Sequence, residues 1–432
     1  MTLAALLLLV VPGADPDTLE TRARTFVARL NKGEYDSATK EFDDAMSKAL
    51  PPDKLKAMWE GITKQVGAFQ KQEKARDEKA GPYDLVFVTC KFEKMALEVK
   101  VVFDKDKKIS GLNILPAQDA DRFPPPAYAK KDAFTEATVK IGSGEWVLPG
   151  TLTLPKGDGP FPAVVLVHGS GPQDRDETIG RLKPFRDLAW GLASKGVAVV
   201  RYEKRTREHP LKSATTKNFT VKDETIDDAL SAAALLRTTA KIDSKRVFIV
   251  GHSQGAMMAP RMALTDMALA GIVLMAGPSR PLEDLILEQT DRGLSDKASK
   301  PDFELKILET LRAIATKVKE GKLTPETPPA ELMGMSPGYW LSIVGYRPPT
   351  DAVKLKLPIL ILQGEADLQV TMTDFEGWKK AMAGRQNVTL KSYPKLSHFF
   401  TPSDGKGDPK EVAKIAHIPE EVVNDIAAWI GK

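Results

Sequence analysis

The pentapeptide Gly251–Gly255 reads Gly-His-Ser-Gln-Gly and places a serine between two glycines. It follows the apolar run Arg246–Val250 and leads into a segment with helical spacing that begins at Gln254. Such a sharp turn from strand to helix strains the backbone of the central serine, and flanking glycines leave room for it. We therefore expect Ser253 to present its hydroxyl at the end of a strand, as a nucleophile.

A serine hydroxyl is a weak nucleophile at neutral pH and needs a neighbouring base. His398 lies in a loop that follows the strand-like run Val388–Tyr393, and the position after a strand makes it the expected base. The nearer histidine, His252, lies inside the pentapeptide. We expect His252 to point away from the Ser253 hydroxyl and to pack in the core.

The base in turn needs an acid that fixes its tautomer and stabilises its charged form. The segment Gly364–Asp367 follows the apolar run Pro358–Gln363 and carries two carboxylates. Side chains at the carboxyl ends of parallel strands meet at one edge of a sheet, so both carboxylates qualify. Asp367 is favoured over Glu365 because it lies deeper in the turn.

A fourth group of residues has the composition of an oxyanion hole. The segment His168–Pro172 follows the apolar run Ala163–Val167, and its small residues allow backbone N–H groups to face a carbonyl oxygen. We expect the N–H groups of Ser170 and Gln254 to be the two donors, each contributing about 3–4 kcal/mol to transition-state stabilisation. The alternative is a glycine-rich turn that only ends a strand. Ser170 is not expected to be the nucleophile, because no strand-to-helix turn surrounds it.

These segments together resemble the α/β-hydrolase superfamily over residues from about 135 to 432. The resemblance is closest to bacterial esterases and lipases, in a branch that is also similar to dienelactone hydrolases and serine aminopeptidases. It implies the fold, the order Ser, Asp, His along the chain and no particular substrate. Dienelactone hydrolases proper use a cysteine nucleophile, which Ser253 argues against. The segments that carry the resemblance are His168–Gly171, Arg201–Arg205, Gly251–Gly255, Gly364–Asp367 and Ser397-His398.

Alternation of strand and helix patterns after Ala133 predicts an α/β fold with a mostly parallel sheet. The wholly apolar run Ala163–Val167 is typical of a parallel strand that is covered on both faces. This alternation of strands and helices is interrupted over about residues 280–354, which have a mainly helical pattern and are expected to form a cap. Within this cap we expect Met333, Met335, Tyr339 and Trp340 either to line an acyl pocket or to pack among themselves.

Residues 17–116 predict a separate small α+β domain, followed by a proline-containing linker over residues 117–134 and a catalytic domain over residues 135–432. The small domain resembles modules of unassigned function that precede such hydrolases in bacteria. Its expected helices and strands are Thr18–Leu30, Tyr35–Met46 and Pro51–Gln65, then Tyr83–Cys90, Ala96–Phe103 and Lys108–Leu115.

Residues 1–15 contain the apolar run Leu3–Val11, which is too short to span a bilayer as a helix. The run and the following Pro-Gly-Ala are typical of a secretory signal peptide, although the positively charged start is missing. We therefore expect a secreted or periplasmic protein. If the run is instead a buried first helix or strand, the expected location is the cytoplasm.

The composition limits the remaining function classes. The 62 basic and 58 acidic side chains give a net charge of +4 and are mixed along the chain, so neither nucleic acid nor an anionic membrane surface is an expected partner. One cysteine excludes an internal disulfide, and the five scattered histidines predict no metal site. We expect no cofactor, no stable membrane insertion and a small-molecule substrate.

The sequence thus predicts a serine hydrolase that cleaves small to medium carboxylic esters through an acyl-enzyme. An aminopeptidase or acyl thioesterase with the same triad is the first alternative. For an aminopeptidase, Glu283, Asp284 and Glu288 would hold the substrate ammonium, unless they are only a solvated helix face. The second alternative is a non-catalytic binding protein on the same fold.

Overall fold

The computed structural model divides the chain into two compact units, Met1–Arg122 and Phe123–Lys432. It describes residues 18–80, 83–117, 123–295, 300, 302–406 and 411–432. The expected signal peptide over residues 1–15 lies outside the described residues. Among the described helices, none combines the length and the apolar character that crossing a membrane requires.

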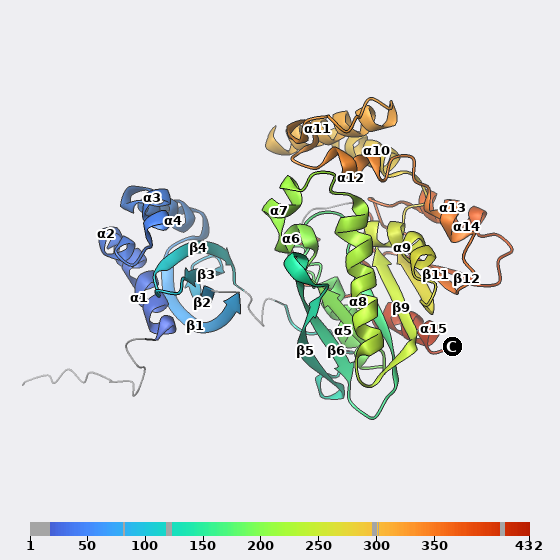
Figure 1. The fold of residues 1–432 in the computed structure, drawn as a ribbon, viewed down its shortest axis with the longest axis horizontal. Coiled ribbons are helices and arrows are strands. Elements are labelled where there is room, and N and C mark those ends of the chain that lie inside the picture. Colours follow the sequence, from blue (N-terminus) through green and yellow to red (C-terminus); the bar gives the residue numbers. More distant parts are fainter. Residues whose placement is uncertain (1–17, 81–82, 118–122, 296–299, 301, 407–410) are drawn as a thin grey trace, which may run out of the picture. The chain divides into compact units, whose positions relative to one another are not determined.

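The first unit packs helices on one face of a four-stranded antiparallel sheet with the order β1-β2-β3-β4 (Figure 1). Its core joins Phe26 and Leu30 of one helix to Val88, Val99 and other inward-facing strand residues. The elements are α1 (Leu19–Lys32), α2 (Tyr35–Thr39), α3 (Asp44–Ala49), α4 (Pro52–Val66), β1 (Phe69–Ala80), β2 (Tyr83–Phe92), β3 (Ala96–Phe103) and β4 (Ile109–Pro116).

Strand β1 was not expected from the sequence. Its twelve residues read Phe-Gln-Lys-Gln-Glu-Lys-Ala-Arg-Asp-Glu-Lys-Ala, and charged residues of this kind are depleted in strands. The segment forms an edge strand that pairs only with β2, and charged side chains are common on such edges because they discourage further pairing. Backbone pairing with β2 therefore overrides the weak local preference.

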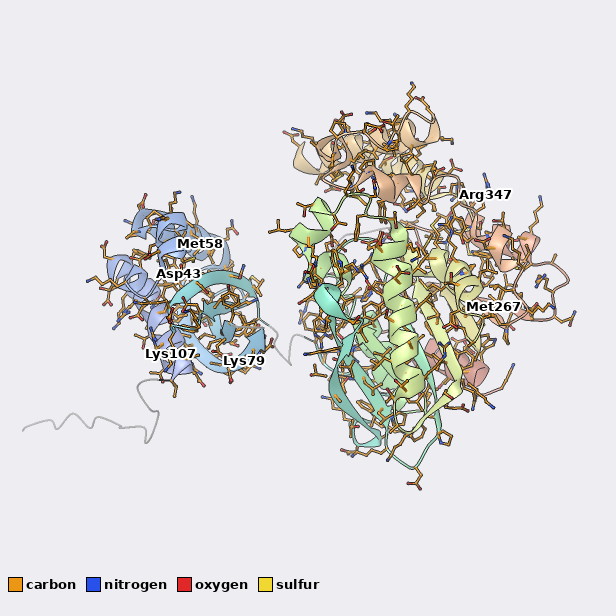
Figure 2. All side chains as sticks on the ribbon, viewed as in Figure 1. Asp43, Met58, Lys79, Lys107, Met267 and Arg347 are labelled. Carbon is orange, nitrogen blue, oxygen red and sulfur yellow. The ribbon has the colours of Figure 1, made fainter. Side chains whose placement is uncertain are left out.

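The single helix expected over Tyr35–Met46 is instead two helices, α2 and α3. Between them Phe42 forms a parallel bridge with Ile109 of β4, and the Asp43 N–H donates to the Ile109 carbonyl at 3.0 Å. The side chain of Asp43, labelled in Figure 2, then caps α3 by accepting from the Met46 N–H at 2.6 Å. Contact with the sheet thus interrupts the helical pattern.

The second unit is a mixed, mostly parallel sheet of eight strands, as expected for the fold class. The strand order is β12-β11-β10-β9-β7-β8-β6-β5, with β5 and β6 antiparallel at one end. The strands are β5 (Phe134–Ile141), β6 (Leu148–Pro155), β7 (Phe161–Val167), β8 (Ala198–Tyr202), β9 (Ile242–His252), β10 (Gly271–Met275), β11 (Ile359–Gly364) and β12 (Val388–Tyr393).

Helices cover both faces of this sheet, as Figure 1 shows. One apolar core joins the sheet to α8 (Asp227–Thr238), α9 (Gln254–Thr265) and α14 (Met372–Ala381). A second core joins the opposite face to α5 (Pro184–Ala193) and α15 (Glu420–Ile430). Burial on both faces explains why the central strands are continuous apolar runs.

One wide π-helical turn, Lys222–Ile226, directly precedes α8. A capping box starts the turn, because the Asp223 carboxylate accepts from the Thr220 N–H at 2.9 Å. Wide turns of this kind often occur at functional sites, because they shift the side chains that follow. Here the turn carries Glu224, whose contacts are described below.

The cap lies beyond the carboxyl ends of the strands (Figure 1). It contains two long helices that pack against each other, followed by two short ones. The four helices are α10 (Leu282–Ser295), α11 (Asp302–Lys319), α12 (Pro337–Leu341) and α13 (Pro348–Ala352). Tyr339 and Trp340 of α12 are buried against the core of the unit, whereas Met333 is 47% exposed.

Candidate active site

Ser253 occupies the turn between β9 and α9, as the pentapeptide predicts. Its backbone angles are φ 51° and ψ −113°, a region that L-residues rarely adopt. Two hydrogen bonds hold the turn: the Ser253 N–H donates to the Met275 carbonyl and the Met257 N–H donates to the Ser253 carbonyl, both at 2.9 Å. The strain is therefore maintained by the adjacent strand β10 and by the first turn of α9.

The two flanking glycines are required by close backbone contacts. A Cβ atom on Gly255 would lie 2.1 Å from the Val167 carbonyl oxygen, and one on Gly251 would lie 2.4 Å from the Gly255 carbonyl carbon. Backbone atoms cannot move aside as a flexible side chain can. The spacing of the glycines thus reflects how tightly β7, β9 and α9 meet at Ser253.

The expected acid and base lie together. His398 Nδ1 and Asp367 Oδ2 are 2.8 Å apart, and both side chains are buried. The other carboxylate oxygen of Asp367 accepts from the N–H groups of Gln369 at 2.7 Å and Val370 at 2.9 Å. The competing candidate, Glu365, is exposed and instead accepts from the Ser392 hydroxyl at 2.8 Å. The geometry therefore pairs His398 with Asp367.

His252 connects the serine turn to the His398 loop. Its Nε2 lies 2.9 Å from the His398 carbonyl oxygen, and the centroids of the two imidazole rings are 4.7 Å apart. Since His252 directly precedes Ser253, these contacts bring His398 and the serine turn to the same edge of the sheet. His252 is buried as expected, but its contacts are polar and go beyond simple core packing.

The partner of His252 on the other side is Glu177, which the sequence did not single out. His252 Nδ1 lies 3.0 Å from Glu177 Oε1, and Glu177 is 2% exposed. Burial alone would lower the pKa of His252, but the Glu177 carboxylate and the His398 carbonyl raise it above its ordinary value. Burial would likewise raise the pKa of Glu177, but His252 lowers it overall. Because both ring nitrogens face acceptors, the geometry favours an imidazolium at His252 paired with the Glu177 carboxylate.

Replacing His252 by glutamine is expected to lower the unfolding free energy by about 3 kcal/mol, because it leaves Glu177 buried without its charge partner. Because folding raises the pKa of His252, its positive charge stabilises the fold fully below the ordinary pKa of 6.5. This stabilisation is lost as the pH rises through the pKa that His252 has in the folded protein. Because folding lowers the pKa of Glu177, its negative charge stabilises the fold fully above the ordinary pKa of 4.5. This stabilisation is lost as the pH falls through the lower pKa that Glu177 has in the folded protein. The difference in unfolding free energy between wild type and His252→Gln should therefore be largest between pH 4.5 and pH 6.5.

Thermal unfolding of both proteins from about pH 4 to about pH 9 measures this difference. The other titratable groups that face the pair include Asp367, His168 and the ring of His398. Burial lowers the pKa of His168 to about 4, so His168 stays neutral through most of the range. A stability difference that increases steadily above neutral pH would contradict the imidazolium assignment.

The turn expected to form the oxyanion hole lies directly against Ser253. A Cβ atom on Gly169 would be 3.2 Å from Ser253 Cβ. The Gly169 N–H donates to Glu177 Oε1 at 2.7 Å and is therefore already engaged. The Ser170 N–H has no acceptor among the described residues, and Gln254 begins α9, where the first N–H groups have no partner inside the helix. The backbone N–H groups of Ser170 and Gln254, which the sequence suggests as oxyanion donors, thus have no acceptor among the described residues.

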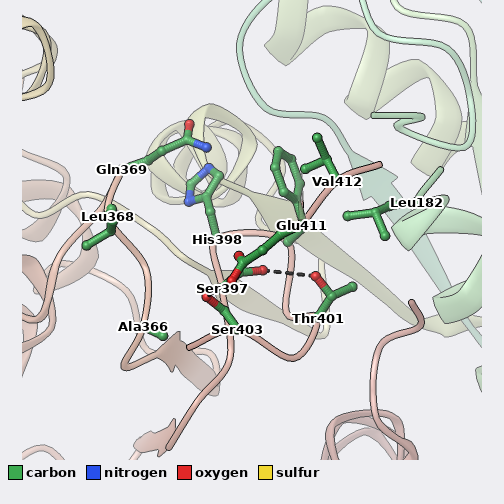
Figure 3. Close-up of a pocket in the computed structure, with 11 residues that line it drawn as sticks. Leu182, Ala366, Leu368, Gln369, Ser397, His398, Thr401, Ser403, Glu411 and Val412 are labelled. Carbon is green, nitrogen blue, oxygen red and sulfur yellow. Dashed lines mark hydrogen bonds between the residues drawn. The ribbon is translucent and has the colours of Figure 1, made fainter. Parts of the chain in front are cut away.

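One cavity is lined by His398, and a second is lined by Glu224 and Tyr339, which contact the Gln254 side chain. The first, about 170 Å³, has His398 and Gln369 on one side and Leu182 and Val412 on the other (Figure 3). The second, about 140 Å³, lies under the cap and is lined by Met333, Met335, Tyr339 and Glu224, among others. Three of the four cap residues expected near an acyl pocket therefore line a cavity, while Trp340 packs in the core. No cluster of His, Cys, Asp and Glu in the described part of the chain is arranged to bind a metal ion.

Comparison with known proteins agrees with this fold. Residues 164–415 match the family described as "Alpha/beta hydrolase family", and residues 23–112 match "Protein of unknown function (DUF3887)". The chain belongs to the alpha/beta hydrolase family. It is 35% identical to Esterase EstD of Thermotoga maritima over 417 residues. This aligned region covers 96% of this chain and 95% of that protein.

Two solved structures illustrate more distant similarity. An esterase of Pyrococcus furiosus is 17% identical, with a TM-score of 0.45 over 71% of this chain and 96% of that one. A Pyrococcus horikoshii acylaminoacyl peptidase is 15% identical, with a TM-score of 0.45 over 86% of this chain and 57% of that one.

Proposed function

We propose that the protein hydrolyses carboxylic esters by a serine mechanism. Ser253 attacks the ester carbonyl while His398 takes the hydroxyl proton, and Asp367 orients and stabilises the resulting imidazolium. The N–H groups of Ser170 and Gln254 bind the oxyanion. His398 then protonates the leaving alcohol and activates water, which hydrolyses the acyl-enzyme. The observation that carries the proposal is the strained Ser253 turn beside the buried Asp367–His398 pair.

The similarity to Esterase EstD over nearly the whole chain supports an ester as the scissile group. The cavities support a small substrate. Pockets for drug-sized ligands usually enclose about 300–1,000 Å³, whereas the cavity at His398 and the cavity at Glu224 and Tyr339 measure about 170 and 140 Å³. The second cavity has a mainly apolar lining, which comes from the cap and from residues 206–224, and suits a short acyl chain.

The contacts of the acidic cap residues disfavour the aminopeptidase alternative. Glu283 is buried and accepts from the Gly345 N–H at 2.8 Å. Asp284 pairs with Lys319 at 2.8 Å, and Glu288 pairs with Arg280 at 2.7 Å. Each carboxylate already has a donor within the protein, so the three do not form a free site for a substrate ammonium group.

Labelling with a fluorophosphonate probe tests the mechanism, because the probe modifies only an activated serine. Peptide mapping of the labelled protein should place the probe on Ser253, with none on Ser170. Hydrolysis of p-nitrophenyl esters should be fastest for short acyl chains and should fall as the chain outgrows the cavities. A folded protein that neither reacts with the probe nor hydrolyses any ester would contradict the proposed function and favour the second alternative, a non-catalytic binding protein.

Export is a separate part of the proposal. It is supported by the apolar run Leu3–Val11 and the Pro-Gly-Ala that follows it. Amino-terminal sequencing of the mature protein from its native source should begin after residue 15 or close to it. A mature chain that still begins at Met1 would argue for a cytoplasmic protein.

A further inference from the structure

One peptide group of the oxyanion turn is held by a buried lysine. Lys204 Nζ donates to the Gly169 carbonyl oxygen at 2.7 Å, and Lys204 is 2% exposed. On the other side of the same residue, the Gly169 N–H donates to Glu177 at 2.7 Å. The backbone of Gly169 is therefore fixed by a cation at its carbonyl and by a carboxylate at its amide.

The lysine contact also fixes the next N–H group. The Gly169 carbonyl and the Ser170 N–H belong to one peptide plane, and in a trans peptide the two groups point in opposite directions. Turning the carbonyl toward Lys204 therefore turns the Ser170 N–H away from it. Gly169 lies against Ser253, so this orientation decides whether the Ser170 N–H is available to an oxyanion.

A buried ammonium group is expensive to desolvate unless it is paired. Lys204 pairs with Glu224 at 3.4 Å, and Glu224 is 5% exposed. An apolar side chain would fill the same space without this requirement. The presence of a buried Lys204 ammonium group instead of an apolar side chain therefore points to a role for this group at the Gly169 carbonyl.

Glu224 extends the same network to the second oxyanion donor. Its carboxylate accepts from Gln254 Nε2 at 3.1 Å, and Gln254 Nε2 also lies 2.7 Å from the Tyr339 hydroxyl of the cap. The π-helical turn of residues 222–226 places Glu224 where it contacts both Lys204 and Gln254. One buried ion pair thus contacts the peptide group that carries the Ser170 N–H, through the Gly169 carbonyl, and the side chain of Gln254, the other proposed donor.

We propose that Lys204, supported by Glu224, is a positioning residue of the oxyanion hole. It contacts no substrate and acts by holding the Gly169 carbonyl, so that the Ser170 N–H faces the developing negative charge. The inference rests on the proposed serine mechanism and adds to it a residue to which the sequence assigned no chemical role.

The test compares Lys204→Met with wild type in steady-state ester hydrolysis and in binding of a trifluoromethyl ketone. Such a ketone adds to the active serine and forms a tetrahedral oxyanion. Complete loss of one donor typically lowers kcat about 10²- to 10³-fold, so a misoriented donor should lower it about 10- to 100-fold. KM should change less than about 3-fold, since the ground-state carbonyl depends little on this donor. Affinity for the ketone should fall in parallel with kcat/KM.

Arg205→Met is the matched control. Arg205 is the neighbouring residue and forms a mostly buried ion pair with Asp228, with Nε and Oδ2 3.0 Å apart. No contact joins Arg205 to Gly169 among the described residues. This variant should lose stability comparably to Lys204→Met, yet keep wild-type kcat and ketone affinity in its folded fraction.

Lys204→Met with wild-type kcat and ketone affinity would overturn the inference, as would an equal kinetic loss in Arg205→Met. If Lys204→Met does not fold, Glu224→Gln tests the same network, because it removes the charge that fixes Lys204. Glu224→Gln should also lower kcat and ketone affinity together, and wild-type values for both would overturn the inference. Wild-type protein without turnover or probe labelling would instead overturn the proposed function and, with it, this inference.

Discussion

Ser253→Ala is expected to lower kcat for a p-nitrophenyl ester by about 10⁵- to 10⁶-fold, while the protein folds normally. Loss of the nucleophile from a serine triad has effects of this size, because base and acid cannot act without it. The residual rate comes from the oxyanion donors and from substrate binding. Folding should be preserved because the turn is held by backbone hydrogen bonds to Met275 and Met257, which alanine retains.

Ser170→Ala is the matched control for this prediction. Ser170 is also a serine beside the site, and its side chain is exposed. Alanine removes the hydroxyl and keeps the backbone N–H that the mechanism uses. Its kcat should stay within about 3-fold of wild type, which separates the role of the Ser253 hydroxyl from that of the turn. A large loss in Ser170→Ala with activity retained in Ser253→Ala would reverse the assignment of the nucleophile.

Asp367→Asn is expected to lower kcat by about 10⁴-fold at neutral pH. The Asp367 carboxylate accepts from His398, from Gln363 Nε2 at 3.2 Å and from two backbone N–H groups. An asparagine can satisfy these donors with only one oxygen. Its NH₂ group must then face either the backbone donors or His398 Nδ1, and in the second case it imposes the wrong tautomer on the base. KM should change little, since Asp367 is buried behind His398.

Glu365→Gln is the control for the acid, because Glu365 lies two residues away and was the competing candidate. Its carboxylate contacts the Ser392 hydroxyl at 2.8 Å. Activity should be unchanged within about 2-fold. Equal losses in Asp367→Asn and Glu365→Gln would indicate that the loop, rather than the Asp367 carboxylate, was damaged.

The catalytic candidates could be predicted because each follows a segment with a strand pattern in the sequence. Val388–Tyr393 is a strand in the structure with the bounds that the sequence indicated, and His398 follows it. The residues that support the candidates could not be found in this way. Glu177 lies in a loop of mixed charge, and Lys204 lies in a basic cluster that resembles a solvated surface. The local sequence of neither residue indicates burial, and only the structure shows it.

The same limit applied to the first unit. The charged strand β1 has little strand preference of its own and forms because β2 offers a partner for its backbone. The break at Phe42 arises from a bridge to Ile109, which is 67 residues further along the chain. Both features depend on pairing with distant segments, which helical or strand periodicity does not encode.

The sequence by itself determined the α/β class, the order of the candidate residues Ser253, Asp367 and His398, and the need for glycine at two positions. These depend on apolar periodicity and on steric limits within a few residues. Only the tertiary structure decided that Asp367 rather than Glu365 pairs with His398, that His252 pairs with the buried Glu177, and that Lys204 contacts the Gly169 carbonyl. Such facts depend on desolvation and on the spacing between side chains from separate elements, and both arise only when the chain is folded.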